Sequence, residues 1–127
     1  MVKAYFDFDA EKNAFEMRVQ GHADFAELGK DPVCAGASVL AFTAAQVIDI
    51  IDRNQLLEES VIRISGGNVR LVCRPNEKSF CRVQTVFLFA QIGMQLLEAA
   101  YPGHVSVKMF AAADAEAIKD SSTSRTD

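Results

Sequence analysis

The chain has 127 residues and a formal net charge of -4, and half of its residues are hydrophobic, as expected for one soluble globular domain. The acidic balance argues against a general nucleic-acid binder. We find no apolar run approaching the roughly 20 residues of a membrane span. The alternating, acid-containing N-terminus is also unlike a secretory signal. Three cysteines without a C-x-x-C pair favour a reducing, cytoplasmic setting.

The N-terminal segment predicts a β-hairpin. Residues 2–9 alternate between apolar and polar, which indicates a strand with one buried face. After a polar turn at 10–13, a second alternating run points its apolar members inward: Phe15, Met17 and Val19. His22 follows this run at an even-numbered position, like the residues of the run that face outward. We therefore place His22 at the end of the second strand.

The remainder of the chain predicts a helix, a second hairpin, another helix and a last strand. From Val33 to about Arg53 apolar residues recur every three or four positions, with many alanines on the packing face. Glycines beside Asn68 separate two further alternating runs, as in a hairpin. Ser79 or Asn76 is expected to cap a helix that ends near Ala100, and residues 105–109 form a short strand.

This order, ββαββαβ, predicts an α/β (α+β) fold: a two-layer sandwich of a mixed five-stranded sheet with two helices on one face. We expect one domain over residues 1–110 and a C-terminal extension, 111–127, that is a frayed helix or disordered. The outer sheet face carries Tyr5, Val72 and Phe110 among charges. That leaves open a homodimer that buries this face, although scattered exposed apolar residues are ordinary.

The candidate catalytic residues lie in two short segments: Gly21-His22-Ala23, and the start of the first predicted helix around Cys34. Asp31 followed by Pro32 is typical of a helix N-cap and first turn. Cys34 then lies where backbone N–H groups are expected to be unpaired and the helix dipole favours an anion. Those groups would stabilise a thiolate and, after attack, an oxyanion. A histidine within reach would accept the thiol proton.

Residues around this pair support the same hypothesis. Ser38 lies one helical turn beyond Cys34, where its hydroxyl could brace His22, contact a substrate, or bond back to the Cys34 carbonyl. The intervening segment, 24–30, is short and irregular, which suits a mobile loop over a cleft. Its candidate substrate contacts are Phe25, Leu28 and Gly29.

Each residue also has an ordinary structural explanation. A cysteine is commonly buried in a core, and a lone histidine at a strand end is commonly solvated. Only the joint placement favours a thiol enzyme. A zinc site is disfavoured because the spacings match no familiar pattern among its candidate ligands, Cys34, Cys73, Cys81, His22 and His104. We interpret the last two cysteines and His104 as structural, and expect no metal or cofactor.

A non-catalytic binding module of the same fold, docking on another protein or on RNA, is the main alternative from another class. Its basis is a group of arginines around the second hairpin, Arg63, Arg70, Arg74 and Arg82. A solvated strand face explains that group equally well.

The two segments resemble the hallmark of the bacterial ribosomal-processing cysteine proteases (Prp, or YsxB-like, family). That hallmark is G-H-A, a loop ending in glycine, and then D-x-V-C-A-x-x-S, and the matching residues are Gly21-His22-Ala23, Gly29, Asp31, Val33-Cys34-Ala35 and Ser38. Strand order and length agree over roughly the first 110 residues. The departures are Pro32 and Gly36-Ala37, where larger aliphatic residues are expected. They would alter the pocket wall.

The resemblance implies a cytoplasmic endopeptidase that removes the N-terminal extension of a large-subunit ribosomal protein (bL27 type) before ribosome assembly. It implies a catalytic dyad at His22 and Cys34, with Asp31 and Ser38 supporting the site. It also implies a peptide as substrate, with no cofactor, no membrane and no stable nucleic-acid partner. Under the same resemblance, the non-catalytic alternative is a ribosome-associated binding module that docks on a ribosomal protein or RNA.

Overall fold

The structure, a computed structural model, describes residues 1–27 and 29–109. Its elements are β1 (Val2–Asp9), β2 (Ala14–Gln20), α1 (Pro32–Arg53), β3 (Leu57–Ser65), β4 (Asn68–Pro75), α2 (Phe80–Ala100) and β5 (Val105–Met109). The predicted order ββαββαβ is confirmed. The predictions for the tail, 111–127, lie outside the described residues.

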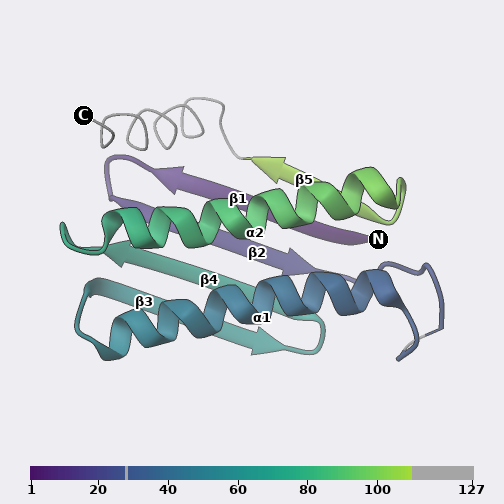
Figure 1. Cartoon of the computed structure of the whole chain (residues 1–127), viewed down its shortest axis with the longest axis horizontal. Coiled ribbons are helices and arrows are strands. Elements are labelled where there is room, and N and C mark those ends of the chain that lie inside the picture. Colours follow the sequence, from purple (N-terminus) through teal and green to yellow (C-terminus); the bar gives the residue numbers. More distant parts are fainter. Residues whose placement is uncertain (28, 110–127) are drawn as a thin grey trace.

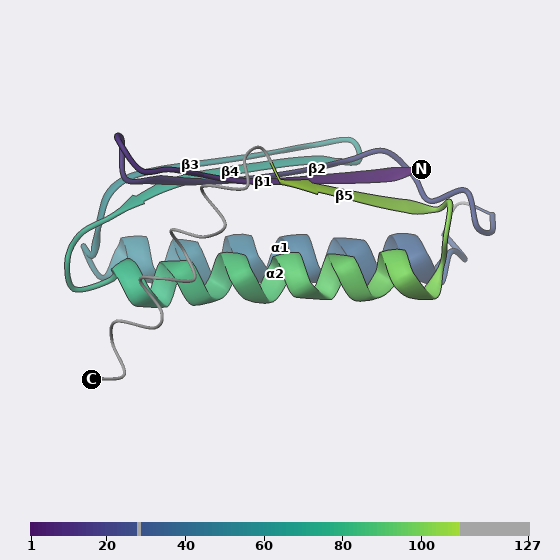
Figure 2. The same cartoon turned by 90° about the horizontal axis from the view of Figure 1, so that it is seen from above.

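The five strands form one sheet in the order β3-β4-β2-β1-β5 (Figure 1). β1 and β5 pair in parallel and the other pairs are antiparallel, so the sheet is mixed, as predicted. Both helices lie on the same face of the sheet (Figure 2). The predicted two-layer sandwich is therefore confirmed.

The core lies between the sheet and the two helices. Alternation along β2 buries Phe15 and Met17, and Phe15 packs against three aromatic rings, those of Phe8, Phe80 and Phe87. The helices approach each other closely. A Cβ on Gly93 of α2 would lie only 2.6 Å from the Leu40 side chain of α1. Small residues thus let long helices lie side by side over a narrow sheet.

The second helix begins differently from the predicted cap. Ser79 holds the N-cap position, but its hydroxyl makes no cap hydrogen bond and instead donates to the Leu56 carbonyl. The Asn76 side chain accepts the N–H groups of Lys78 and Ser79 at 2.9 and 3.0 Å. Asn76 therefore orders the turn before α2, while Ser79 ties that turn to the segment before β3.

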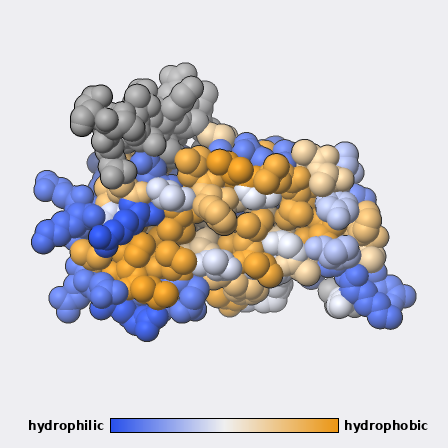
Figure 3. Space-filling view, viewed as in Figure 1, coloured by the Kyte–Doolittle hydropathy of each residue, from blue (hydrophilic) through white to orange (hydrophobic). Residues whose placement is uncertain are grey.

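The outward faces of the helices are largely hydrophobic (Figure 3). Most of the exposed large apolar side chains belong to α1 and α2: Val39, Phe42, Ile50, Leu88, Phe89, Ile92 and Leu96. By length and composition alone, both helices could cross a membrane, a test that the core helix of a soluble protein also passes. The sequence expectation that no run approaches that length was wrong. Apolar exposure is thus greater on the helices than on the outer sheet face, where Tyr5 and Val72 are half-buried.

Candidate active site

Asp31 sets the start of α1. Its backbone is extended, with φ of -89°, and its Oδ1 accepts the N–H groups of Val33 at 2.9 Å and Cys34 at 3.2 Å. Pro32, which has no N–H to satisfy, is the first helical residue. The predicted N-cap is therefore confirmed, and it brings Cys34 into the first turn of the helix.

The same carboxylate also holds the segment that precedes the helix. Asp31 Oδ2 accepts the N–H groups of Phe25 at 2.9 Å and Ala26 at 3.1 Å. Burial alone would raise the pKa of Asp31, but the four backbone donors outweigh it and the pKa is lowered below its ordinary value. An ionised Asp31 thus connects the chain after His22 to the helix that carries Cys34.

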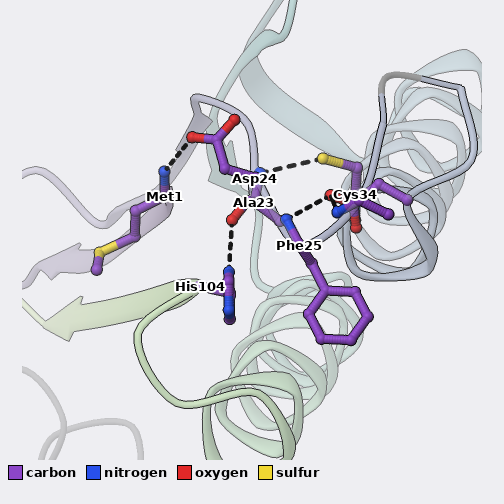
Figure 4. Close-up of polar contacts among 8 residues, drawn as sticks. Met1, Ala23, Asp24, Phe25, Cys34 and His104 are labelled. Atoms are coloured by element: carbon purple, nitrogen blue, oxygen red, sulfur yellow. Dashed lines mark hydrogen bonds and ion pairs between the residues drawn. The ribbon is translucent and has the colours of Figure 1, made fainter.

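The Cys34 thiol is half-buried and faces the chain after β2. The Ala23 N–H donates a hydrogen bond to Cys34 Sγ at 3.1 Å (Figure 4). Cys34, His22 and Ser38 all line one cavity of about 100 Å³. The residues that the sequence pattern singles out therefore border a shared cavity, bounded elsewhere by apolar side chains such as Phe42 and Ile64.

His22 reaches this cavity from beyond the strand that was expected to contain it. β2 ends at Gln20, and Gly21 follows with a left-handed φ of +90°. The chain therefore changes direction before His22, so the parity of the strand does not continue to it. The exposed His22 ring lies against the β3–β4 turn, where a Cβ on Gly67 would be 3.4 Å from its Cε1.

Within residues 1–27 and 29–109, no hydrogen bond joins the His22 ring to Cys34, and the Ser38 hydroxyl makes none. The sulfur's partner is a backbone amide instead. Catalytic hydrogen bonds are often long or absent before substrate binds. The geometry brings the three side chains to one cavity without fixing their mutual contacts.

The first turn of α1 does not offer the unpaired N–H groups expected from the sequence. Asp31 Oδ1 takes those of Val33 and Cys34, and the Asp31 carbonyl accepts the Ala35 N–H at 3.0 Å. The expectation that this turn supplies free oxyanion donors was wrong because a side-chain cap satisfies them. The donor that faces the sulfur is the Ala23 N–H, which sequence reasoning missed.

The segment between the two motifs is held at its beginning. Phe25 is 46% exposed, and its ring packs edge-on against Tyr101 and His104, with centroids 5.0 and 5.2 Å apart. Gly29 is exposed, and Leu28 lies outside the described residues. His104 Nδ1 lies 2.8 Å from the Ala23 carbonyl oxygen, a contact that sequence reasoning also missed because the residues are 81 positions apart.

The other cysteines lie away from the cavity. Cys73 is fully buried in β4, and burial, with a smaller contribution from the Asp52 charge, raises its pKa to about 12. Cys73 therefore remains a thiol at neutral pH. Cys81 is half-buried at the start of α2. In the part of the chain that the structure describes, no three His, Cys, Asp or Glu side chains gather as a metal site would require.

The arginines that suggested a nucleic-acid surface are partly neutralised by acidic neighbours. Arg70 Nε lies 3.2 Å from Glu16, and Arg74 Nη1 lies 3.7 Å from Glu59. Arg18 also pairs with Glu16. Burial alone would raise the pKa of Glu16, but its hydrogen bonds to Arg18 and Arg70 lower it. This strand face is thus a mixed-charge surface.

A thiol at a helix N-terminus and an imidazole on the same cavity, in a two-layer α+β sandwich, are features of a thiol hydrolase. The model of the cysteine protease Prp family matches residues 1–106. The chain therefore belongs to the Prp family and is a cysteine protease. None of the curated proteins matches it.

Solved structures share this fold. An essential ribosomal processing protease Prp from S. aureus, in complex with a covalently linked product peptide, superposes with a TM-score of 0.65 at 22% identity, covering 86% of this chain and 99% of that one. The S. aureus protease with a substrate peptide has a TM-score of 0.62 at the same identity and coverage. SMU.848 from Streptococcus mutans has a TM-score of 0.61 at 20% identity, covering 86% and 93%. These likenesses support the fold.

Proposed function

We propose that this protease removes the N-terminal extension of a large-subunit ribosomal protein of the bL27 type, in the cytoplasm and before ribosome assembly. Its membership of the Prp family supports this function, as do the S. aureus structures described as a ribosomal processing protease with substrate and product peptides. The observation that carries the proposal is the Cys34 thiol at the N-terminus of α1, on a cavity that His22 also lines.

In the proposed mechanism Cys34 is the nucleophile and His22 the proton carrier. His22 takes the thiol proton, and the thiolate attacks the scissile carbonyl carbon to form a C–S bond. As the tetrahedral intermediate collapses, the C–N bond breaks and the imidazolium gives its proton to the leaving amine. Water, deprotonated by His22, then attacks the thioester. The C–S bond breaks, the sulfur takes its proton back from the His22 imidazolium, and the product leaves with a new carboxylate.

The Ala23 N–H is the proposed oxyanion donor. It already lies 3.1 Å from Cys34 Sγ, so it is adjacent to any carbonyl carbon that bonds to this sulfur. A preorganised donor of this kind contributes about 3–4 kcal/mol to transition-state stabilisation in other hydrolases. The donors at the start of α1 are unsuited because Asp31 already binds them.

The remaining predicted residues receive supporting roles. Asp31 connects the His22 segment to α1 through its four hydrogen bonds. Ser38 lines the cavity and has an exposed hydroxyl free to contact the peptide. Phe25, Leu28 and Gly29 belong to the proposed substrate loop. His22 closes on the thiol when the peptide fills the cavity.

Mass spectrometry of the ribosomal protein, carrying its N-terminal extension, tests the proposal after incubation with each enzyme variant. The wild type should shorten the substrate at one position near its N-terminus. Cys34→Ser and His22→Ala should each lower the cleavage rate at least about thousandfold. Cys81→Ala is the matched control, because Cys81 lies outside the cavity lining; it should cleave at the wild-type rate.

Two results would contradict separate parts of the proposal. If the ribosomal protein stays intact while another peptide is cut by wild type but not by Cys34→Ser, the proposed substrate is wrong. The proposed role of Cys34 as nucleophile would then still hold. Cleavage by Cys34→Ser at the wild-type rate would reject the nucleophile.

A further inference from the structure

The backbone of Ala23 is held on both sides. Its N–H donates to Cys34 Sγ at 3.1 Å, and its carbonyl oxygen lies 2.8 Å from His104 Nδ1 (Figure 4). Ala23 is 1% exposed, so water does not compete for either bond. One buried residue therefore connects the sulfur to a histidine 81 positions later in the chain.

The protonation of His104 Nδ1 follows from its partner. A carbonyl oxygen only accepts hydrogen bonds, so Nδ1 carries the hydrogen in this contact. The backbone of His104 is itself fixed: its carbonyl accepts the Val2 N–H at 2.9 Å, and its N–H donates to the Tyr101 carbonyl at 3.1 Å. The ring thus extends from a rigid junction of β1, β5 and the end of α2.

One further ring contact and one strained backbone angle link this junction to the segment after Ala23. The His104 ring packs edge-on against Phe25, at an interplanar angle of 85°. Asp24, which lies between Ala23 and Phe25 in the chain, has a left-handed φ of +54°. This conformation costs energy in a residue other than glycine. Without the bond to the Ala23 carbonyl, the peptide joining Ala23 to Asp24 could relax. The Ala23 N–H belongs to the preceding peptide, and the accompanying change in the Ala23 backbone angles would turn it away from the sulfur.

We propose that His104 is a positioning residue for Cys34: by donating to the Ala23 carbonyl, it keeps the Ala23 N–H directed at Sγ. The inference rests on the proposed role of Cys34 as the nucleophile. An N–H held at the sulfur stabilises a thiolate and needs no rearrangement when charge develops. His104 touches neither sulfur nor substrate in this role; it acts through the backbone of Ala23, whose carbonyl and N–H belong to successive peptides.

Two substitutions separate the hydrogen bond from the ring packing. In His104→Asn the side-chain amide nitrogen is the same number of bonds from Cα as Nδ1, so the hydrogen bond to the Ala23 carbonyl is kept and the ring is lost. In His104→Phe the ring against Phe25 is kept and the donor is lost. The control is Tyr101→Leu, because Tyr101 packs on the same Phe25 ring but makes none of the hydrogen bonds that the structure gives Ala23.

The main measurement is the rate at which iodoacetamide alkylates Cys34 in the native protein at one pH near neutrality, located by peptide mass spectrometry. His104→Phe should react about tenfold more slowly than wild type, the effect of one hydrogen bond of about 1.4 kcal/mol. The kcat for peptide cleavage should fall by a similar factor, with KM unchanged. His104→Asn should retain both rates within about threefold, and Tyr101→Leu should match wild type.

A urea unfolding curve for each variant confirms that every rate refers to folded protein, and His104→Leu replaces His104→Phe if that variant does not fold. If His104→Phe, which lacks the hydrogen-bond donor, is alkylated at the wild-type rate, the inference is overturned. An equal loss in the Asn and Phe variants also overturns it, because the hydrogen bond would then not be the cause. The alkylation assay needs no proteolysis, so a wild type that fails to cut the ribosomal protein would reject the proposed function and leave this inference standing.

Discussion

Gly21, the residue between β2 and His22, is the most demanding backbone position of the site. Its φ is +90°, and a Cβ there would lie 2.5 Å from the Met1 carbonyl oxygen, inside van der Waals contact. The left-handed backbone alone costs an alanine about 1–2 kcal/mol. Relieving the clash requires a backbone shift, which adds about 1–3 kcal/mol. Gly21→Ala should therefore lower the free energy of unfolding by about 2–5 kcal/mol.

Gly103 provides the matched comparison. Its φ of +84° is nearly the same, but a Cβ there would meet nothing within 4 Å. Gly103→Ala should thus lose only the backbone term, about 1–2 kcal/mol. Urea unfolding followed by circular dichroism measures both, with equal m-values as the check that the same transition is compared. Equal losses in the two variants would refute the steric argument. Where Gly21→Ala remains folded, its kcat should fall, because the shift displaces His22.

Three further predictions concern stability and thiol chemistry. With a pKa of about 12, Cys73 should resist alkylation at neutral pH in the folded protein and react only after urea unfolding; rapid native labelling would contradict its burial. Asp31 has a lowered pKa, so the stability it supplies is present above its ordinary pKa of 3.8 and is lost as the pH falls through the folded value. The difference in unfolding free energy between wild type and Asp31→Asn should accordingly shrink on acidification below that pH, whereas a constant difference would show that ionisation is irrelevant. Ser79→Ala should cost about 1–3 kcal/mol in urea unfolding, because the buried hydroxyl donates to the Leu56 carbonyl; a loss below about 0.5 kcal/mol would show that the bond is replaced.

The fold could be predicted because its determinants are local. Alternation along β1 and β2 and the three-to-four spacing of α1 depend only on which face each residue buries. The start of β3 is not visible in this way, because Glu58 and Glu59 interrupt the alternation and the pairing with β4 is irregular between Leu57 and Glu59. Register irregularities of this kind depend on the partner strand, which no short sequence window contains.

The site was only partly predictable for the same reason. The Asp31-Pro32 pair predicts the start of α1, but not that the second carboxylate oxygen binds Phe25 and Ala26. The contact of His104 with Ala23 exists because β5 pairs in parallel beside β1, which places residue 104 next to the N-terminal end of β1. No spacing in the sequence carries that information.

These contacts explain why a site built on a short irregular segment can still hold a sulfur in a defined environment. The chain between Ala23 and Ala26 has no regular secondary structure, yet it is held by Asp31, the N-cap of α1, and by His104, the residue before β5. Loosening either one should free the segment that carries the Ala23 N–H. The environment of Cys34 therefore depends on two anchors that lie just outside the helices and strands.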